Sequence, residues 1–384
     1  MIAYLTDVEG RWDKLASFAQ GNPLVQLAGD RLQLADGATF VFGGDAIDRG
    51  PAGRRIVDTL LAARREYGER VVLLAGNRDI NKLRLVRELA GAPPPEAPPA
   101  KSRGELLRWI FANTMGAGQA FAHRATELGT SDDERVVQSY LDDLAPGGAL
   151  RAYLGQCRLG FRAGATLFLH GGVTADNFGR VPGIAPVPTV DGWLRALEAF
   201  YRDEIAGFEA GREPAALIAY QRPLPGSHLN QTSVVYARPT DDLGNPHLPD
   251  ADVIARLRRD GIGRLVVGHT PSGDCPAILR DGDFELVLAD DSYAPIELGS
   301  QVAISDGEVR IRGATTLDGG ARVVVDFASA RGEPSPLGLR DRDTGELVKA
   351  RLDDGYLMFR AFENHRQQQV VARDLGTRAL DVPR

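Results

Sequence analysis

The sequence has few cysteines and no long hydrophobic run. Cys157 and Cys275 are the only cysteines in 384 residues, and they show no CxxC spacing. We expect both thiols to be reduced in a cytoplasmic protein. No stretch approaches the roughly 18 apolar residues of a membrane span. The first residues lack the basic region, apolar core and cleavage site of a secretory signal, so we do not expect one.

Basic residues are not in excess either, and the formal net charge is −7. This net charge argues against binding of a nucleic-acid partner through the overall electrostatic field of the protein. It still allows a local basic pocket for a small phosphorylated ligand. Hydrophobic residues make up 43% and charged residues 25% of the chain, as in an ordinary globular protein. The length suits one large α/β domain with insertions, or two domains.

Short apolar runs followed at once by Gly, Asp, Asn or His recur along the chain. Because these runs are apolar on both faces, they predict buried strands covered by helices. The residues between them predict helices over 51–67, about 79–90 and about 250–260. The alternation predicts an α/β layered fold with β-sheets packed between helices. The runs are residues 2–5, 39–42, 71–75, 166–169 and 264–267.

The remaining segments predict two insertions and a β-rich C-terminal part. The insertion at about 91–160 begins with a proline-rich connection and continues as helices. The insertion at about 191–250 begins with an amphipathic helix, and both insertions are expected to shape substrate access. We expect one domain of residues 1–330, which contains both insertions, and a C-terminal β-meander extension of residues 331–384. From about residue 300, the pattern predicts the end of the domain's second sheet and then the meander, with strands at 302–304, 309–311, 323–327, 347–352, 356–362 and 369–375.

Each of the five apolar runs ends near a side chain that can bind a metal ion. Asp7 and Asp45 follow the first two, Asn77 the third, and His170 and His269 the last two. Since strand ends in such folds meet at one edge of a sheet, we expect these side chains to converge there. A mixed oxygen and nitrogen set without thiolate suits Mn, Fe, Zn or Mg. Two ions sharing a central carboxylate would clamp the attacking and leaving oxygens of a phosphoryl group.

Residues 44–50, with the sequence GDAIDRG, place further groups beside this site. The glycines permit a tight backbone turn next to the metals. Arg49 presents a fixed fork of donors that suits phosphate oxygens. Asp48 is positioned to orient another active-site group.

This segment resembles the GDxxDRG signature of the phosphoprotein-phosphatase branch of the calcineurin-like metallophosphoesterases. Four other segments are similar to the remaining motifs of that family, and all five occur in the family's order. Asp7 with Gly10 is similar to the first motif, DxHG. The segment GNRD at 76–79 is similar to the third, and residues 170–172 and 268–270 are similar to the two later histidine motifs.

The resemblance implies two divalent metal ions. Asp7 and residue 9 would bind the first ion and Asp45 would bridge both, while the second ion would take the side chains Asn77, His170 and His269. Mn is the ion we expect most, with Fe, Zn, Mg or Ca as alternatives. The resemblance also implies that Arg49 binds phosphate and that a metal-bound hydroxide attacks a phosphomonoester or phosphoanhydride.

Two positions differ from the family's pattern, because Glu9 and Arg78 stand where the family has histidines. Glu9 is a competent oxygen ligand and should favour harder cations such as Mn, Mg or Ca. Arg78 cannot protonate a leaving group near neutral pH, since its guanidinium stays protonated. It can stabilise charge on an oxyanion or bind a second anionic group. It could also pair with Glu9 or Asp48, or be a salt-bridged residue without substrate contact.

We therefore expect catalytic roles for Asp48, Arg49 and Arg78, and substrate contacts from Arg49, Arg78 and Asn77. The family usually has a second phosphate-binding arginine before the last histidine motif, and Arg222 and Arg238 are both positioned for it. The loop Asp290-Asp291-Ser292-Tyr293 is a weaker candidate for touching the substrate.

The leading hypothesis is a phosphoesterase acting on a small phosphorylated molecule or nucleotide, with no nucleic-acid or membrane partner. Because the family's histidine is replaced by Arg78, substrates with good leaving groups should be favoured. The first alternative is a catalytically silent phosphatase-like protein that binds a ligand or partner. A protein serine/threonine phosphatase is the second. The oligomeric state stays open.

Overall fold

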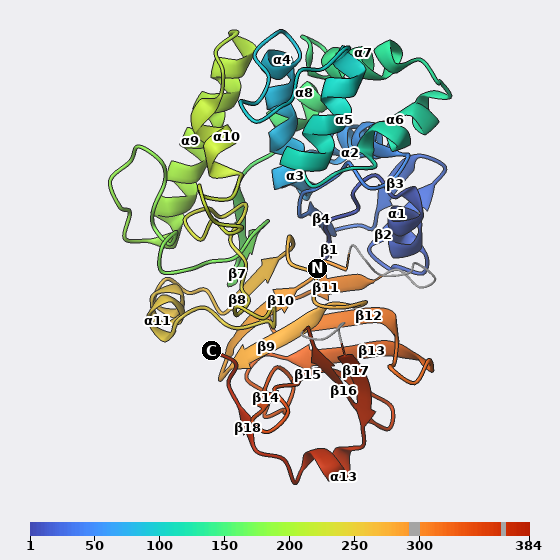
Figure 1. Cartoon of the computed structure of the whole chain (residues 1–384). Helices are drawn as coiled ribbons and strands as arrows, with labels where there is room; N and C mark the ends of the chain where they lie inside the picture. The colour runs from blue at the N-terminus through green and yellow to red at the C-terminus, as the bar shows by residue number, and fades with distance from the viewer. Residues whose placement is uncertain (292–299, 362–365) are drawn as a thin grey trace.

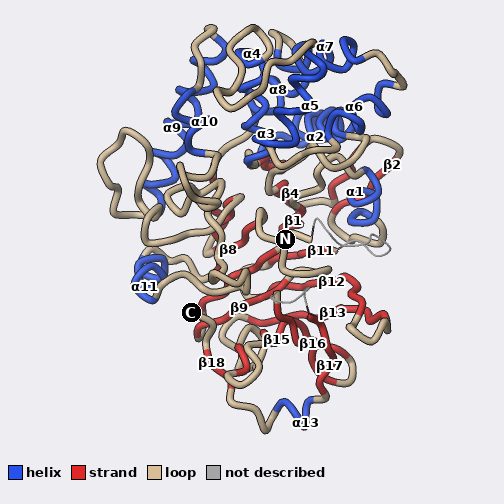
Figure 2. Tube along the Cα trace, viewed as in Figure 1, coloured by secondary structure: helices blue, strands red, loops and turns tan. Residues whose placement is uncertain are grey.

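The computed structural model describes residues 1–291, 300–361 and 366–384. Most helices gather in the upper part of the molecule, and the lower part is formed largely by strands (Figures 1 and 2). Within the described ranges, no helix combines the length and apolar character needed to cross a membrane. The α/β layered fold with β-sheets, covering helices and a β-rich C-terminal region is confirmed.

The first sheet has the strand order β13-β12-β11-β1-β4-β5. Strands β1, β4 and β5 run parallel, while β11 to β13 continue the sheet in antiparallel fashion beyond β1. Strands β11 to β13 therefore join the sheet of β1, and the prediction that they end the second sheet was wrong. The bounds are β1 (Ile2–Leu5), β4 (Thr39–Phe42), β5 (Val71–Leu73), β11 (Gln301–Ile304), β12 (Glu308–Thr316) and β13 (Arg322–Ala330).

The second sheet has the order β6-β7-β8-β10-β9, with β7, β8 and β10 parallel. The two sheets pack on each other, since the ring of Tyr4 in β1 stacks on that of Phe168 in β7 with centroids 5.7 Å apart. The strands that carry the predicted metal ligands are thus divided between two sheets, not gathered at one edge of a single sheet as predicted. The bounds are β6 (Gly160–Ala163), β7 (Thr166–Leu169), β8 (Arg264–Val267), β9 (Ala277–Asp281) and β10 (Phe284–Leu288).

Helices cover the outer sides of these sheets, with α2 against β5 and α9 against β6. The helix predicted at 79–90 is divided into α3 (Asn77–Ile80), a 3-10 turn (Asn81–Arg84) and α4 (Leu85–Glu88). The first insertion is helical, as predicted. The other helices are α1 (Trp12–Ala19), α2 (Gly53–Tyr67), α5 (Arg103–Thr114), α6 (Ala120–Leu128), α7 (Asp133–Leu144), α8 (Ala149–Gln156), α9 (Val190–Glu209), α10 (Ala215–Tyr220) and α11 (Ala251–Arg259).

A third sheet of order β17-β16-β15-β14-β18 forms the C-terminal part, mostly as the predicted meander. The strand predicted over 369–375 was wrong in its second half, which forms α13 (Ala372–Leu375). Val348 and Met358 of this sheet share one buried cluster with Val266 and Val302 of the other two sheets. The bounds are β14 (Arg340–Asp341), β15 (Leu347–Leu352), β16 (Gly355–Arg360), β17 (Arg366–Val370) and β18 (Leu380–Asp381), and the hairpin β2 (Val25–Ala28) and β3 (Arg31–Leu34) was not predicted.

Candidate metal centre

The loops after the site-bearing strands contain unusual backbone conformations. Positive φ angles, which side-chain-bearing residues rarely adopt, occur in the described chain at five residues other than glycine. All five belong to the predicted site: Asp7, Glu9, Asp45, Asp48 and His269. The strain is supported by hydrogen bonds between the loops, from the Asp7 amide to Gly44 O (3.0 Å) and from the Glu9 amide to Asp45 O (2.9 Å). Strained residues held in this way often mark functional sites.

Glycines let these loops approach one another. Gly44 has φ +102°, and a Cβ atom there would lie 2.8 Å from His170 Nδ1. A Cβ atom at Gly76 would overlap the carboxylate of Asp45. The glycines in the two motifs are therefore required by close contact between the strand ends.

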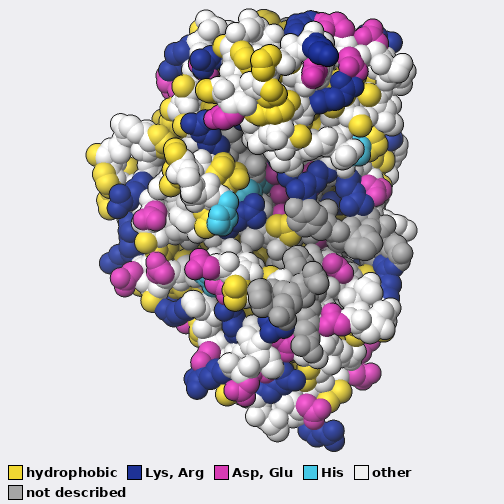
Figure 3. Space-filling view, viewed as in Figure 1, with side chains coloured by type: hydrophobic (Ala, Val, Ile, Leu, Met, Phe, Trp, Pro, Cys, Tyr) yellow, Lys and Arg dark blue, Asp and Glu magenta, His cyan; other side chains and the backbone are white. Residues whose placement is uncertain are grey.

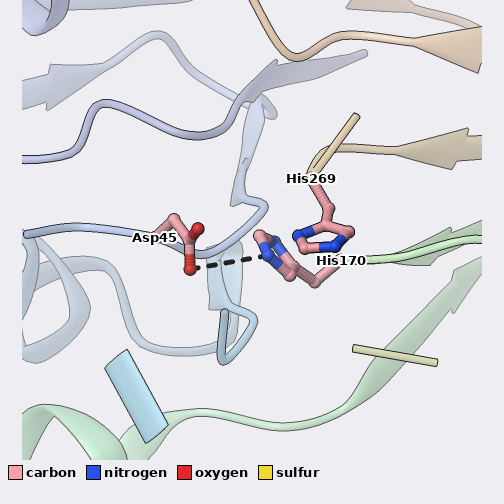
Figure 4. A group of neighbouring side chains, drawn as sticks. All are labelled: Asp45, His170 and His269. Atoms are coloured by element: carbon pink, nitrogen blue, oxygen red, sulfur yellow. Dashed lines mark ion pairs between the residues drawn. The ribbon is translucent and has the colours of Figure 1, made fainter. Parts of the chain in front are cut away.

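Asp45, His170 and His269 form the centre of the site (Figure 4). Each offers a ligand atom, and these atoms lie within 4.8 Å of one another. Gly43 O lies 2.8 Å from His170 Nδ1, which leaves Nε2 directed toward Asn77 Oδ1 at 3.3 Å and Asp45 Oδ1 at 3.5 Å. The structure thus brings together Asn77 and the three side chains that the sequence predicted around the second ion.

The chemistry of this group fits a divalent cation. His269 Nε2 is buried and has no hydrogen-bond partner in the part of the chain that the structure describes. Burial, assisted by nearby Arg238 and His170, lowers the pKa of His269 well below its usual range, so its imidazole is neutral and keeps a lone pair. Burial would also lower the pKa of His170, but the charges of Asp45 and Asp7 raise it overall. A divalent cation among these groups would accept the unused lone pair of His269 and would balance the excess negative charge of the carboxylates.

Asp7 lies at the edge of this group. Its Oδ2 accepts hydrogen bonds from Thr6 Oγ1 (2.5 Å) and from the His269 amide (3.1 Å). Burial raises the pKa of Asp7, and the neighbouring Asp45 raises it further. Asp7 therefore connects the loop after β1 to the loop after β8 and also lines the cavity described below.

Glu9 is held by two arginines. Arg78 Nε lies 2.6 Å from Glu9 Oε1, and Arg49 Nη1 lies 3.4 Å from Glu9 Oε2. Burial raises the pKa of Glu9 to about 8, although Arg78 and Arg49 oppose the shift. Arg78 Nη1 is also 3.8 Å from Asp48 Oδ2. Both pairings considered for Arg78 from the sequence are therefore present, and the one with Glu9 is much closer.

The site opens into a cavity of about 340 Å³. Arg49, Arg222 and Arg238 all contribute to its wall, and histidine and basic side chains gather around the hollow in Figure 3. Neither Arg222 nor Arg238 has a side-chain hydrogen bond or ion pair to another described residue. Both insertions reach the cavity, the first through residues 113–116 and the second through residues 221–223, 236 and 238.

The two described residues of the candidate loop after β10 make different contacts. Asp290 lines the cavity, whereas Asp291 pairs with Lys14 at 2.5 Å between Nζ and Oδ1. Ser292 and Tyr293 lie outside the described residues. The structure therefore places one member of this loop beside the site.

A family model described as calcineurin-like phosphoesterase matches residues 1–273, which include all five strand-end motifs. The chain belongs to this family. It is accordingly a hydrolase that acts on phosphate esters, and the family implies divalent metal ions at the centre described above.

The chain is similar to solved structures of phosphatases. The cold-active protein-tyrosine phosphatase of a psychrophilic Shewanella species is 16% identical, with 84% of this chain and 79% of that chain covered and a TM-score of 0.48. A point mutant of a cold-active protein tyrosine phosphatase, with the same identity and coverage, has a TM-score of 0.51. A protein serine/threonine phosphatase from Saccharomyces cerevisiae is 13% identical over 88% of this chain and 82% of that chain, with a TM-score of 0.39. No curated protein matches the sequence.

Two residues of the phosphoesterase have structural roles that the sequence did not predict. Lys82 is fully buried, and its Nζ donates to Asp48 Oδ2 (2.7 Å), Asn81 Oδ1 (2.7 Å) and Arg78 O (3.0 Å). Asp79 accepts hydrogen bonds from the amides of Asp45, Ala46 and Gly76, and so fastens two loops together. The position of Lys82 one helical turn after Arg78 was the only signal in the sequence.

Proposed function

We propose that this phosphoesterase hydrolyses a small phosphorylated molecule, either a phosphomonoester or a phosphoanhydride, with Mn as the preferred metal. The observation that carries the proposal is the group Asp45, His170 and His269 on a cavity whose wall also presents Arg49 and Arg238. The volume of about 340 Å³ lies within the range of small-molecule sites. The proposal retains a cytoplasmic setting without nucleic-acid or membrane partners.

The residues have separate roles in this reaction. A divalent ion held by Asp45, Asn77, His170 and His269 would supply Lewis-acid activation of the phosphoryl group and of the attacking water. Arg49 and Arg238 would bind phosphoryl oxygens through their donor forks. His170 is oriented for its role by the contact between Nδ1 and Gly43 O.

The leaving group receives no proton from Arg78, because a guanidinium stays charged near neutral pH. We therefore expect anhydrides and aryl phosphates to react much faster than alkyl phosphates. Rates measured with Mn for a series of phosphate monoesters should depend steeply on the pKa of the leaving group. Equal rates for alkyl and aryl esters would contradict this part of the proposal.

Asp45→Asn tests whether the centre is catalytic. We expect kcat with an aryl phosphate to fall by at least about 100-fold, because this carboxylate lies within reach of both histidines. Asp36→Asn is the matched control, since Asp36 is exposed and is not among the residues that line the cavity. If the unaltered protein shows no turnover, the catalytically silent alternative is favoured. A preference for phosphopeptides over small esters would favour a protein phosphatase.

A further inference from the structure

Three acidic side chains crowd one side of the centre. Asp7, Glu9 and Asp45 are each at most 3% exposed and all line the same cavity. Buried carboxylates need a compensating cation, because removing them from water is very unfavourable. A metal ion is one possible cation, and a protein side chain is another.

On this side of the centre, Arg78 supplies a cation. Its Nε lies 2.6 Å from Glu9 Oε1 and 3.5 Å from Asp45 Oδ2, so one guanidinium contacts both carboxylates. Its backbone amide also donates to Asp45 Oδ1 at 2.8 Å, which anchors the residue at the start of α3. The side chain is 11% exposed, and Nη1 reaches Gly116 O at 3.4 Å on the first insertion. Both the backbone amide and the guanidinium of Arg78 are therefore fixed beside these carboxylates.

His269 differs from these carboxylates. Its buried Nε2 has no hydrogen-bond partner among the described residues. A divalent ion can bind this nitrogen without breaking a hydrogen bond of His269. An ion bound to Glu9 would instead share its carboxylate with the guanidinium, and two cations so close together repel strongly when water is excluded.

We propose that the guanidinium of Arg78 takes the place of a second metal ion, so that the protein binds one divalent ion, at Asp45, Asn77, His170 and His269. This inference rests on the proposed function for its metal site, but it concerns the number of ions. Arg78 then places one permanent positive charge beside Glu9 and Asp45. It also presents a fixed positive charge to the cavity, where it can contact phosphoryl oxygens beside Arg49.

Metal content and Mn electron paramagnetic resonance test the proposal. The purified full chain, saturated with Mn and freed of excess ion, should hold about one equivalent with the spectrum of an isolated ion. Arg78→Ala should raise the content toward about two equivalents and produce the signature of a spin-coupled pair, because the carboxylates lose their cation. The matched control Arg87→Ala, which removes an exposed arginine paired with Glu213, should stay at the content of the unaltered protein.

Two equivalents with a coupled spectrum in the unaltered protein would overturn the proposal, and so would an Arg78→Ala variant that remains at one. If Arg78→Ala does not fold, the double variant Glu9→His/Arg78→His, which has the family's histidines at both positions, provides the same comparison. The unaltered protein could hold one equivalent that His269→Ala loses and yet hydrolyse no phosphoester. That result would support the single-ion site and contradict the proposed function. Retention of that equivalent in His269→Ala would overturn the assigned location.

Discussion

Glu9 shows at the residue scale how burial changes an ordinary carboxylate. It is enclosed between two arginines, yet burial outweighs their charges and raises its pKa to about 8. Between about pH 4.5 and about pH 8, the native chain therefore holds a proton that the unfolded chain has released. Stability must fall as the pH rises through this window.

Glu9→Gln should remove this dependence. In the presence of a chelator, the free energy of unfolding of the unaltered protein should decrease from pH 5 to pH 8 more than that of the variant. The difference should exceed about 1 kcal/mol, since one unit of pKa shift corresponds to about 1.4 kcal/mol. Urea unfolding at the two pH values measures it. Parallel pH dependences of the two proteins would show that the Glu9 pKa is not raised.

The choice between Arg222 and Arg238 also belongs to single residues. The charge of Arg238 contributes to lowering the pKa of His269. Arg222, by contrast, is exposed and also lines a neighbouring cavity next to Trp109. We expect Arg238→Ala to lower kcat/KM by about 10- to 100-fold through kcat, because Arg238 lines the cavity and is near enough to His269 to influence its pKa. Arg222→Ala should mainly raise KM. Steady-state kinetics with an aryl phosphate separate the two, and the opposite assignment would exchange these effects.

At the scale of elements, the centre depends on loops from different strands meeting without side chains between them. The loop after β5 reaches Asp45 because Gly76 has no Cβ atom. The amide of Gly76 and that of Asp45 both donate to Asp79 Oδ2, so one carboxylate links the two loops. This arrangement positions Asn77 and Arg78 at the beginning of α3.

Gly76→Ala should therefore damage the centre. We expect Mn affinity to fall by at least about 10-fold and stability by about 1–3 kcal/mol, because the new methyl group overlaps the Asp45 carboxylate. Gly307→Ala is the matched control, since a Cβ atom there meets nothing within 4 Å. Titration calorimetry and urea unfolding measure both effects. Unchanged Mn affinity in Gly76→Ala would contradict this account.

At the scale of the whole molecule, the C-terminal sheet supports the centre although the family model ends at residue 273. Lys349 in β15 is fully buried, and its Nζ donates to Ser272 O, three residues after His269. Its ammonium also lies 4.6 Å from the ring centre of Phe359. The loop that carries His269 is thus held from below by the third sheet.

Lys349→Met keeps most of the side-chain volume but removes the donor to Ser272. We expect the affinity for Mn to fall by about 10-fold, as for other residues that orient metal ligands, while the fold is retained. Lys101→Met alters an exposed lysine and should have no effect. Calorimetry with Mn, checked by circular dichroism, decides the outcome. Equal affinities would show that the third sheet does not support the loop.

The sequence was sufficient for the features that depend on local pattern. The apolar runs correctly predicted β1, β4, β5, β7 and β8, since buried strands need apolar residues on both faces. The motifs at their ends predicted Asp45, Asn77, His170 and His269 as neighbours, and these side chains are together in the structure. The division of the chain at residue 330 stays a prediction.

Only the tertiary structure decided how charges are paired and which sheets meet. Arg78 and Glu9 lie 69 positions apart in the sequence, and Lys349 and Ser272 lie 77 positions apart. Such contacts arise from the packing of two sheets and a third sheet on a shared core, for which no local pattern exists. The same packing buries Glu9 and Lys82, and burial determines their pKa values and partners. Sequence therefore predicted the candidate ligands, while three-dimensional packing decided which charged groups accompany them.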